Sequence, residues 1–322
     1  MSDSSEDFEF YEKITYNSRL YCSLVSIIFI ILLFIFVFFS FLYNFFISKS
    51  KTSSKKSFCF FSIGTLGKIM IFFSIFCIFL KSLVSCIFSY EDILNNKNKC
   101  FIQGLIINIS EISLICWNSN LNYFIYQFLF KNFNIKVNLI LYLIYGFLPS
   151  FLLSFIPIII KKDKYEIFGK SGAWCWIHFD EDKNNKFNSI LIFITYFFEW
   201  INIIYTLYVI NKIDKYLKHM INQSENSEIL NKFLSFLMSF PIILFFIWIF
   251  PSINRIYSFI TKKDNFTFYM GNGISMGLLG FFFSLNYFYF TYKKYFKCCF
   301  KENNIDKLNE EINEENNEEI GS

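Results

Sequence analysis

Residues 27–39 read IIFIILLFIFVFF, an unbroken apolar run without a charge, a glycine or a proline. No charged side chain occurs anywhere in residues 21–47, a stretch longer than the ~20 residues that cross a ~30 Å hydrocarbon core as a helix. A backbone surrounded by lipid has to satisfy its own hydrogen bonds, and an α-helix does so within one segment. This stretch therefore predicts a transmembrane helix and a helical membrane protein.

The rest of the chain repeats this pattern. Six more apolar runs occupy residues 69–89, 101–128, 139–160, 190–210, 233–253 and 268–289. Continuous runs of this length do not fit the ~10-residue alternating strands of a membrane barrel. The sequence therefore predicts an all-α integral membrane protein, a seven-transmembrane helix bundle.

The third run differs from the others because polar side chains interrupt it. They are Asn108, Glu111, Asn118, Asn120 and Asn122. A helix tolerates such residues when other helices surround it, whereas a helix that faces lipid does not. We therefore expect the third helix to lie inside the bundle.

The overall composition agrees with a membrane protein. Of the 322 residues 54% are hydrophobic, 23% aromatic and 17% charged, whereas soluble domains carry about a quarter charged residues. This balance excludes an ordinary soluble enzyme, and a net charge of +4 with both signs mixed gives no indication of nucleic-acid binding. Because the sequence shows no metal-ligand spacing and no nucleophile with an adjacent base, we expect no catalytic residue, no metal and no cofactor.

Lysines determine the expected orientation. Residues 49–56 hold four lysines and no acid, while residues 1–20 are net negative. Lysine-rich loops stay on the cytoplasmic side of a membrane. We therefore expect a multi-pass cell-membrane protein that divides into an acidic extracellular N-terminus (1–20), a seven-transmembrane bundle (21–292) and a cytoplasmic juxtamembrane helix with an acidic tail (293–322).

Two pairs of cysteines bear on this topology. Cys100 precedes the third run and Cys175 lies between the fourth and fifth, both on the expected oxidising side, so we predict a disulfide between them, with two free thiols as the alternative. Cys298 and Cys299 follow the seventh run among lysines. This position is typical of palmitoylation on a short helix lying along the membrane, and an unmodified amphipathic turn is an equal alternative.

Two further motifs surround the seventh run. Asn265 begins the sequence Asn-Phe-Thr, an N-glycosylation site close to the expected outer membrane surface. Gly273 and Gly277 are four residues apart, which predicts close packing against another helix.

Several short motifs resemble those of a known family. They are Ala173-Trp174-Cys175-Trp176-Ile177, Cys100-Phe101-Ile102-Gln103, Ile253-Asn254-Arg255-Ile256 and Gly280-Phe281-Phe282 followed by Ser284-Leu285. In these motifs, and in Pro241 and Trp248, the chain resembles the cyclic AMP receptors of social amoebae, which are G-protein-coupled receptors. The resemblance implies that the chain binds an extracellular small ligand, cyclic AMP or another anion, and a heterotrimeric G protein.

The marks of rhodopsin-type receptors are missing from the sequence. No Asp-Arg-Tyr closes the third run, and the seventh run has no Asn-Pro-x-x-Tyr. The seventh run also lacks a lysine, so retinal has no attachment point for a Schiff base there.

Four ionisable residues fall within the apolar runs or at their edges: Lys81, Glu111, Glu199 and Arg255. Such residues are costly in lipid and usually serve function, so we predict a polar pocket that opens outward. Arg255, expected to cap the sixth run on the outside, and Lys81 are available to an anionic ligand, because a guanidinium fork suits a phosphate. In the structural alternative Lys81 and Glu111 neutralise each other and Arg255 reaches the headgroups.

The sixth run contains a candidate activation hinge. Trp248 lies between Pro241 and Pro251, and a proline frees a carbonyl one turn earlier and kinks a helix. Residues 211–232, between the fifth and sixth runs, are expected to form an inner loop long enough to contact a G protein. The competing class is a transporter or channel that uses the intramembrane Lys81 and the two glutamates, although seven helices do not divide into two matching halves.

Overall fold

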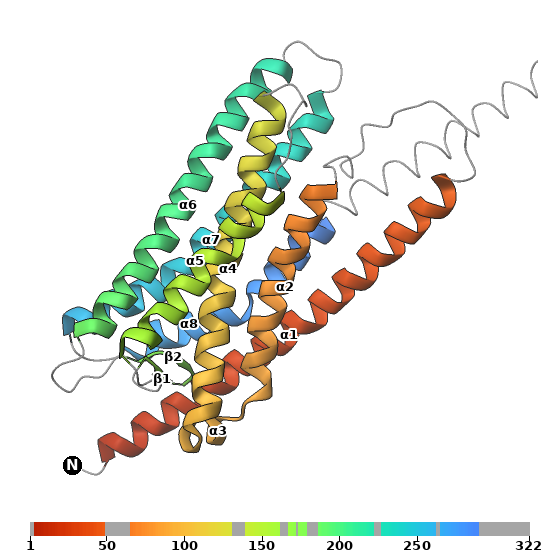
Figure 1. Cartoon of the computed structure of the whole chain (residues 1–322). Helices are drawn as coiled ribbons and strands as arrows, with labels where there is room; N and C mark the ends of the chain where they lie inside the picture. The colour runs from red at the N-terminus through yellow and green to blue at the C-terminus, as the bar shows by residue number, and fades with distance from the viewer. Residues whose placement is uncertain are drawn as a thin grey trace, which may run out of the picture.

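The computed structural model describes residues 3–48, 65–130, 139–161, 167–171, 173–178, 186–221, 227–261 and 265–289. Over these residues the chain forms a bundle of long helices with a two-stranded hairpin at one end (Figure 1). The elements are α1 (Asp3–Ser48), α2 (Thr65–Ile87), α3 (Tyr90–Asn95), α4 (Lys97–Phe130), α5 (Leu139–Lys161), β1 (Phe168–Lys170), β2 (Cys175–Ile177), α6 (Lys186–Ile221), α7 (Ser227–Thr261) and α8 (Phe266–Gly277). A further helix, Leu279–Tyr289, follows α8.

Six of the described helices are long and apolar enough to cross a membrane. The pair formed by α8 and Leu279–Tyr289 passes the same test as one span bent by 45° and brings the number to seven. The prediction of a seven-helix membrane protein is thereby confirmed.

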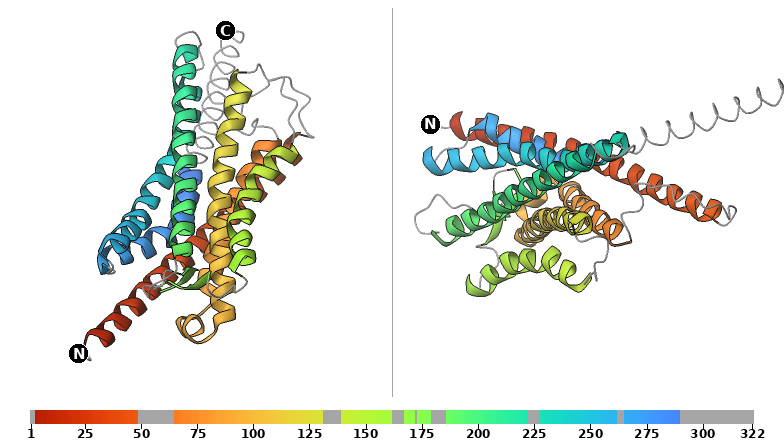
Figure 2. Two further views of the ribbon diagram at one scale, coloured as in Figure 1. Left: turned by 60° about the vertical axis from the view of Figure 1, so that its left-hand side comes forward. Right: turned by 90° about the horizontal axis from the view of Figure 1, so that it is seen from above.

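Helix α4 lies in the middle of the bundle (Figure 2). It packs against α2, α5 and α6, while α1, α2, α6, α7 and α8 continue the packing around it. Its candidate span is 72% buried, the highest share of the six. Its polar residues account for this position, because they bond to other helices rather than facing lipid: Asn108 Nδ2 lies 2.9 Å from Ser154 Oγ, and Ser113 Oγ lies 2.7 Å from Ser150 Oγ.

The start of α1 and the end of α7 differ from the sequence prediction. Helix α1 begins at Asp3 and its candidate span at Glu9, so the expected boundary at residue 20 falls inside a continuous helix. Helix α7 continues to Thr261, so Arg255 lies within the helix and does not cap it.

The expected loop of residues 211–232 is also mostly helical. Helix α6 runs to Ile221 and α7 begins at Ser227. The ion pair between Lys218 and Asp214, 2.8 Å apart and one turn from each other, supports the extension of α6 beyond its apolar part.

The break in the seventh span is held by a serine from α1. In a continuous helix the Gly277 carbonyl would accept from the Phe281 N–H. Here the Ser26 hydroxyl lies between the two groups: it donates to the Gly277 oxygen at 2.5 Å and accepts from the Phe281 nitrogen at 3.1 Å. An inserted side chain of this kind is a recognised cause of a kink.

Glycines let α1 come this close. A Cβ on Gly277 would lie 2.7 Å from Cys22 Cβ, and one on Gly273 would lie 3.2 Å from Thr15 Cγ2. The predicted close packing at these two glycines is confirmed, with α1 as the partner helix.

We expect Ser26→Ala to lower the thermal stability of the purified protein. Ser26 is fully buried, and its loss leaves one carbonyl and one N–H without the partner that they have now, at about 1–3 kcal/mol for each group. Ser23→Ala is the matched control, because Ser23 is also buried on α1 but does not bond to this break. Equal melting temperatures for the two variants would show that the serine bridge does not stabilise the bend.

Candidate functional site

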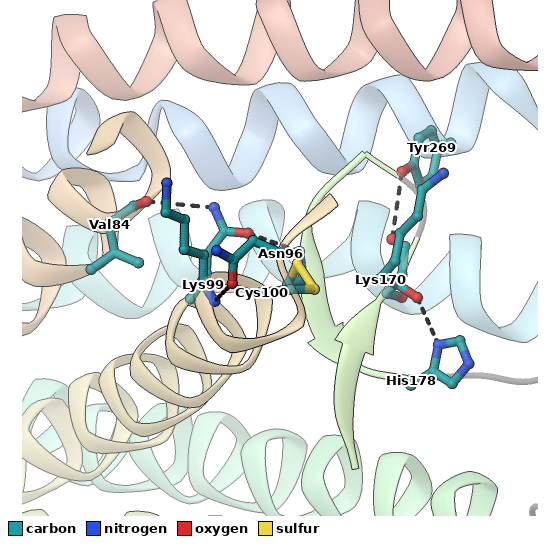
Figure 3. Close-up of a disulfide and its surroundings, with 10 residues drawn as sticks. Val84, Asn96, Lys99, Cys100, Lys170, His178 and Tyr269 are labelled. Atoms are coloured by element: carbon teal, nitrogen blue, oxygen red, sulfur yellow. Dashed lines mark hydrogen bonds between the residues drawn. A yellow bond between two sulfur atoms is a disulfide. The ribbon is translucent and has the colours of Figure 1, made fainter. Parts of the chain in front are cut away.

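The hairpin covers one end of the bundle, which we call the hairpin end. Strands β1 and β2 are antiparallel, with Gly169 opposite Trp176. A disulfide joins Cys100 of α4 (Figure 3) to Cys175 of β2, as predicted. The side-chain oxygen of Gln103 accepts from the Cys175 N–H at 2.9 Å. Trp174 and Trp176 are both only 5% exposed, so this segment is packed into the helices rather than lying over them as a loose loop.

Helix α1 holds one side of the hairpin. Lys170 of β1 forms an ion pair of 2.7 Å with Glu12, and the Tyr90 hydroxyl donates to the same carboxylate at 3.0 Å. Burial and the nearby Glu12 raise the pKa of Tyr90, which keeps its hydroxyl protonated as the donor. His178 closes the hairpin through a 2.7 Å bond between its Nδ1 and the Lys170 carbonyl (Figure 3).

Helices α7 and α8 hold the other side through Ser171. Arg255 Nη2 donates to the Ser171 hydroxyl at 2.7 Å, and its guanidinium lies 5.1 Å from the ring of Trp176. The Tyr269 hydroxyl approaches the Ser171 carbonyl at 3.5 Å (Figure 3), and its ring stacks on Trp174. The structure therefore places Arg255 against the hairpin.

Below the hairpin, ionisable side chains of three helices, α2, α4 and α6, lie close together. Lys81 of α2 and Glu111 of α4 form an ion pair of 2.7 Å, with both side chains buried. The Lys81 ammonium also lies 3.0 Å from Met276 Sδ and 5.7 Å from the ring of Trp248. The indole N–H of Trp248 donates to Glu199 of α6 at 2.7 Å. The two glutamates and Lys81 are thus brought together, and the pairing of Lys81 with Glu111 is confirmed.

Arg19 also belongs to this region, although the sequence did not predict a role for it. Its side chain is only 4% exposed, and its guanidinium lies 4.4 Å from the ring of Trp174. Residues 1–20 were expected to lie outside the bundle, so no role was sought there. The spacing of residues along α1 could have indicated its burial, because buried residues recur every three or four positions and so share one helix face: Glu12, Tyr16, Arg19, Ser23, Ser26, Ile30 and Leu33.

The structure also describes the predicted hinge residues of α7 and the predicted glycosylation site. Pro241 and Pro251 both lie inside α7, which is helical throughout, and Trp248 between them is 1% exposed. Asn265 is the N-cap of α8, its side-chain oxygen accepting from two backbone N–H groups. Cys298 and Cys299, and the helix expected around them, lie outside the described residues.

Two other features concern metal binding and cavities. In the described part of the chain no three His, Cys, Asp or Glu side chains are grouped so that they could hold a metal. A narrow pocket lies toward the opposite end of the bundle, between Leu33, Asn118, Phe240 and Ser284, and does not reach the charged cluster.

Comparison with known proteins bears on the fold. No protein-family profile and no curated protein matches the sequence. Among solved structures, the crystal structure of squid rhodopsin is similar with a TM-score of 0.51 and 12% identity over 88% of this chain and 82% of that one. At this identity the likeness concerns the fold alone. The chain is thus a multi-pass membrane protein with the seven-helix fold of a rhodopsin.

Proposed function

We propose that this chain is a G-protein-coupled receptor for a small extracellular anion and that it resembles the cyclic AMP receptors in function as well as in motifs. The observation that supports the proposal best is the charge balance beneath the hairpin. Arg19, Lys81 and Arg255 supply three cations, whereas Glu111 and Glu199 supply two carboxylates. An anion that reaches this region restores the balance.

The proposed orientation puts the hairpin end and the N-terminus outside the cell. The disulfide supports it, because such bonds persist on the oxidising side of a membrane. The lysine-rich residues 49–56 then fall on the cytoplasmic side, as the positive-inside rule requires.

The proposed ligand contacts are Arg255 and Lys81, with Glu111 and Glu199 as the groups that respond. An anion near Lys81 competes with Glu111 for the ammonium, which weakens the buried ion pair. Lys81 also lies near the Trp248 ring, and the Trp248 N–H is bonded to Glu199. A ligand therefore has a physical route to α7, and a bundle with two arrangements can pass this change to a G protein at its other end.

Helix α7 is the proposed moving element. Pro251 cannot donate to the carbonyl one turn earlier, so the helix is weakest just where Trp248 and Glu199 meet. The helical extensions of α6 and α7 beyond the apolar spans, rather than a long loop, offer the surface for the G protein.

Binding to intact cells that express the full chain tests this proposal. Cyclic AMP is the first ligand, followed by other small anions, and dissociation of a heterotrimeric G protein is the second readout. We expect Arg255→Ala to weaken binding by about 1.5–3 kcal/mol, roughly ten- to a hundredfold, through loss of a charge-assisted hydrogen bond. Arg255→Lys is expected to recover only part of this loss, because an ammonium cannot reproduce the planar fork.

Lys97→Ala is the matched control, because Lys97 is an exposed cation at the same end of the bundle. Normal surface expression of Arg255→Ala with unchanged affinity would show that Arg255 only fastens Ser171 and the hairpin. Absence of G-protein dissociation with every anion would count against the receptor proposal itself.

A further inference from the structure

Arg19 is a buried cation without a matching anion. Its Nε has no hydrogen-bond partner, although only 4% of the residue is exposed. In the described part of the chain no carboxylate forms a salt bridge with it. The acid that acts on it electrostatically is Glu111, but this carboxylate is bonded to Lys81 at 2.7 Å.

Burial of the Arg19 guanidinium without a counter-ion is unfavourable. A guanidinium removed from water without an anion loses hydration that one aromatic contact does not replace. Lys81 adds to the cost, since Lys81 and Arg19 are like charges that act on each other. An arginine that is retained in such surroundings indicates a function for its positive charge. The simplest function is to bind an anion that neutralises it.

The contact with Trp174 leaves the binding groups of Arg19 available. A guanidinium that stacks on an aromatic ring uses its flat face, whereas all of its N–H donors point outward in its own plane. The Arg19 guanidinium lies 4.4 Å from the ring of Trp174, a contact that takes up none of its hydrogen-bond donors. This planar edge matches two oxygens of a phosphate or carboxylate group.

Arg255 makes a useful contrast. It also lies near a tryptophan of the hairpin, Trp176, so the two arginines flank the Trp-Cys-Trp segment from different helices. Its Nη2, however, already donates to the Ser171 hydroxyl at 2.7 Å. Arg255 therefore fastens the hairpin in this structure, while Arg19 makes no comparable bond in the described residues.

We infer that Arg19 anchors an oxyanion, a phosphate or carboxylate group, bound beneath the hairpin against α1 and Trp174. The inference rests on the proposed function and adds a third cation, besides Arg255 and Lys81, to the groups that hold the ligand of that site.

Thermal unfolding of the purified full chain with inorganic phosphate tests the inference. Phosphate replaces chloride at constant ionic strength in detergent without phospholipid, and acetate serves as a carboxylate probe. We expect one of the two anions to raise the melting temperature of the wild type in a saturable way. For Arg19→Gln we expect the half-maximal anion concentration to rise roughly ten- to a hundredfold, and for Arg19→Lys by less.

Lys13→Gln is the matched control, since it removes the same charge from an exposed position of α1. It is expected to respond to the anion as the wild type does, which also corrects for the general effect of phosphate on protein stability. Arg19→Met tests the missing counter-charge directly. Without added anion it is expected to melt no lower than the wild type, because an apolar side chain replaces an uncompensated buried charge.

Three results would overturn the inference. They are a wild-type melting temperature that responds neither to the two anions nor to added phosphatidic acid, an Arg19→Gln response equal to that of the wild type, and an Arg19→Met variant that melts well below the wild type without anion. If the rise requires added phosphatidic acid instead of free phosphate, the oxyanion site stands and its occupant is a lipid headgroup.

G-protein dissociation separates this inference from the proposed function. Stabilisation by an anion through Arg19, without G-protein dissociation, would leave the oxyanion site and remove the receptor function. If an anion causes G-protein dissociation with equal potency in the wild type and in Arg19→Gln, the receptor function stands and the role of Arg19 is excluded.

Discussion

Replacing Cys175 with serine is expected to cause one of the two largest losses of stability and surface expression among the single substitutions considered. The bond between Cys175 and Cys100 spans a sequence separation of 75 residues, and loss of a native disulfide typically costs about 2–5 kcal/mol. The hairpin is short, so it depends on contacts outside itself: the disulfide, the Gln103 bond, and the contacts of Lys170 and Ser171. Surface staining and the melting temperature of the purified protein measure the loss.

The double variant Cys100→Ser/Cys175→Ser makes this prediction sharper. If the disulfide is the interaction that is lost, the second substitution adds little to the first, and the two effects are strongly non-additive. Cys86→Ser is the matched control, because Cys86 is a free, half-buried cysteine near the C-terminal end of α2. Additive losses, or labelling of Cys175 by a thiol reagent on unreduced intact cells, would contradict the disulfide.

The helices of this protein could be predicted from sequence because lipid leaves the backbone few alternatives. Each continuous apolar run became a span, and the polar third run became the buried helix α4. The pairing of Lys81 with Glu111 was also within reach, since two opposite charges at similar depth in neighbouring spans have a strong reason to meet.

Features that depend on distant contacts could not be predicted in the same way. The bend after Gly277 is stabilised by Ser26, which is 251 residues away in sequence. The sequence of the seventh run alone therefore does not predict it. The ends of α6 and α7 also escaped prediction, because hydropathy marks where a helix leaves the membrane and not where it ends. Arg19 is a different case: it belongs to a helical stripe of buried residues on α1, but the acidic residues around it indicate a segment outside the membrane.

The position of Arg255 shows how the length of a helix changes the expected surroundings of a residue. The apolar run of the sixth span ends at residue 253, which predicts that Arg255 caps the helix on the outside. In the structure the helix continues to Thr261, and Arg255 bonds to Ser171 of the hairpin. The surroundings of Arg255 therefore depend on a residue 84 positions earlier in the chain, which the local sequence does not indicate.

Lys81→Met is the second substitution expected to have a large effect. Methionine has a similar length, so packing is largely retained, but Glu111 loses its 2.7 Å partner while remaining 7% exposed. Removing one member of a buried ion pair typically costs about 3–5 kcal/mol, because the other charge stays buried without compensation. We expect a large fall in the melting temperature of the purified protein and in the amount that reaches the cell surface.

The double variant Lys81→Met/Glu111→Leu distinguishes a charge effect from a packing effect. Replacement of a whole buried ion pair by apolar side chains is often neutral or stabilising, so the double variant is expected to recover most of the stability lost in Lys81→Met. Lys13→Met is the matched control for loss of a lysine at an exposed position. A double variant as unstable as Lys81→Met would show that the lysine stabilises the bundle through its contacts with Met276 and Trp248 instead of through Glu111. Rescue of folding without rescue of G-protein dissociation is the expected combination, because the proposed ligand response acts through this ion pair.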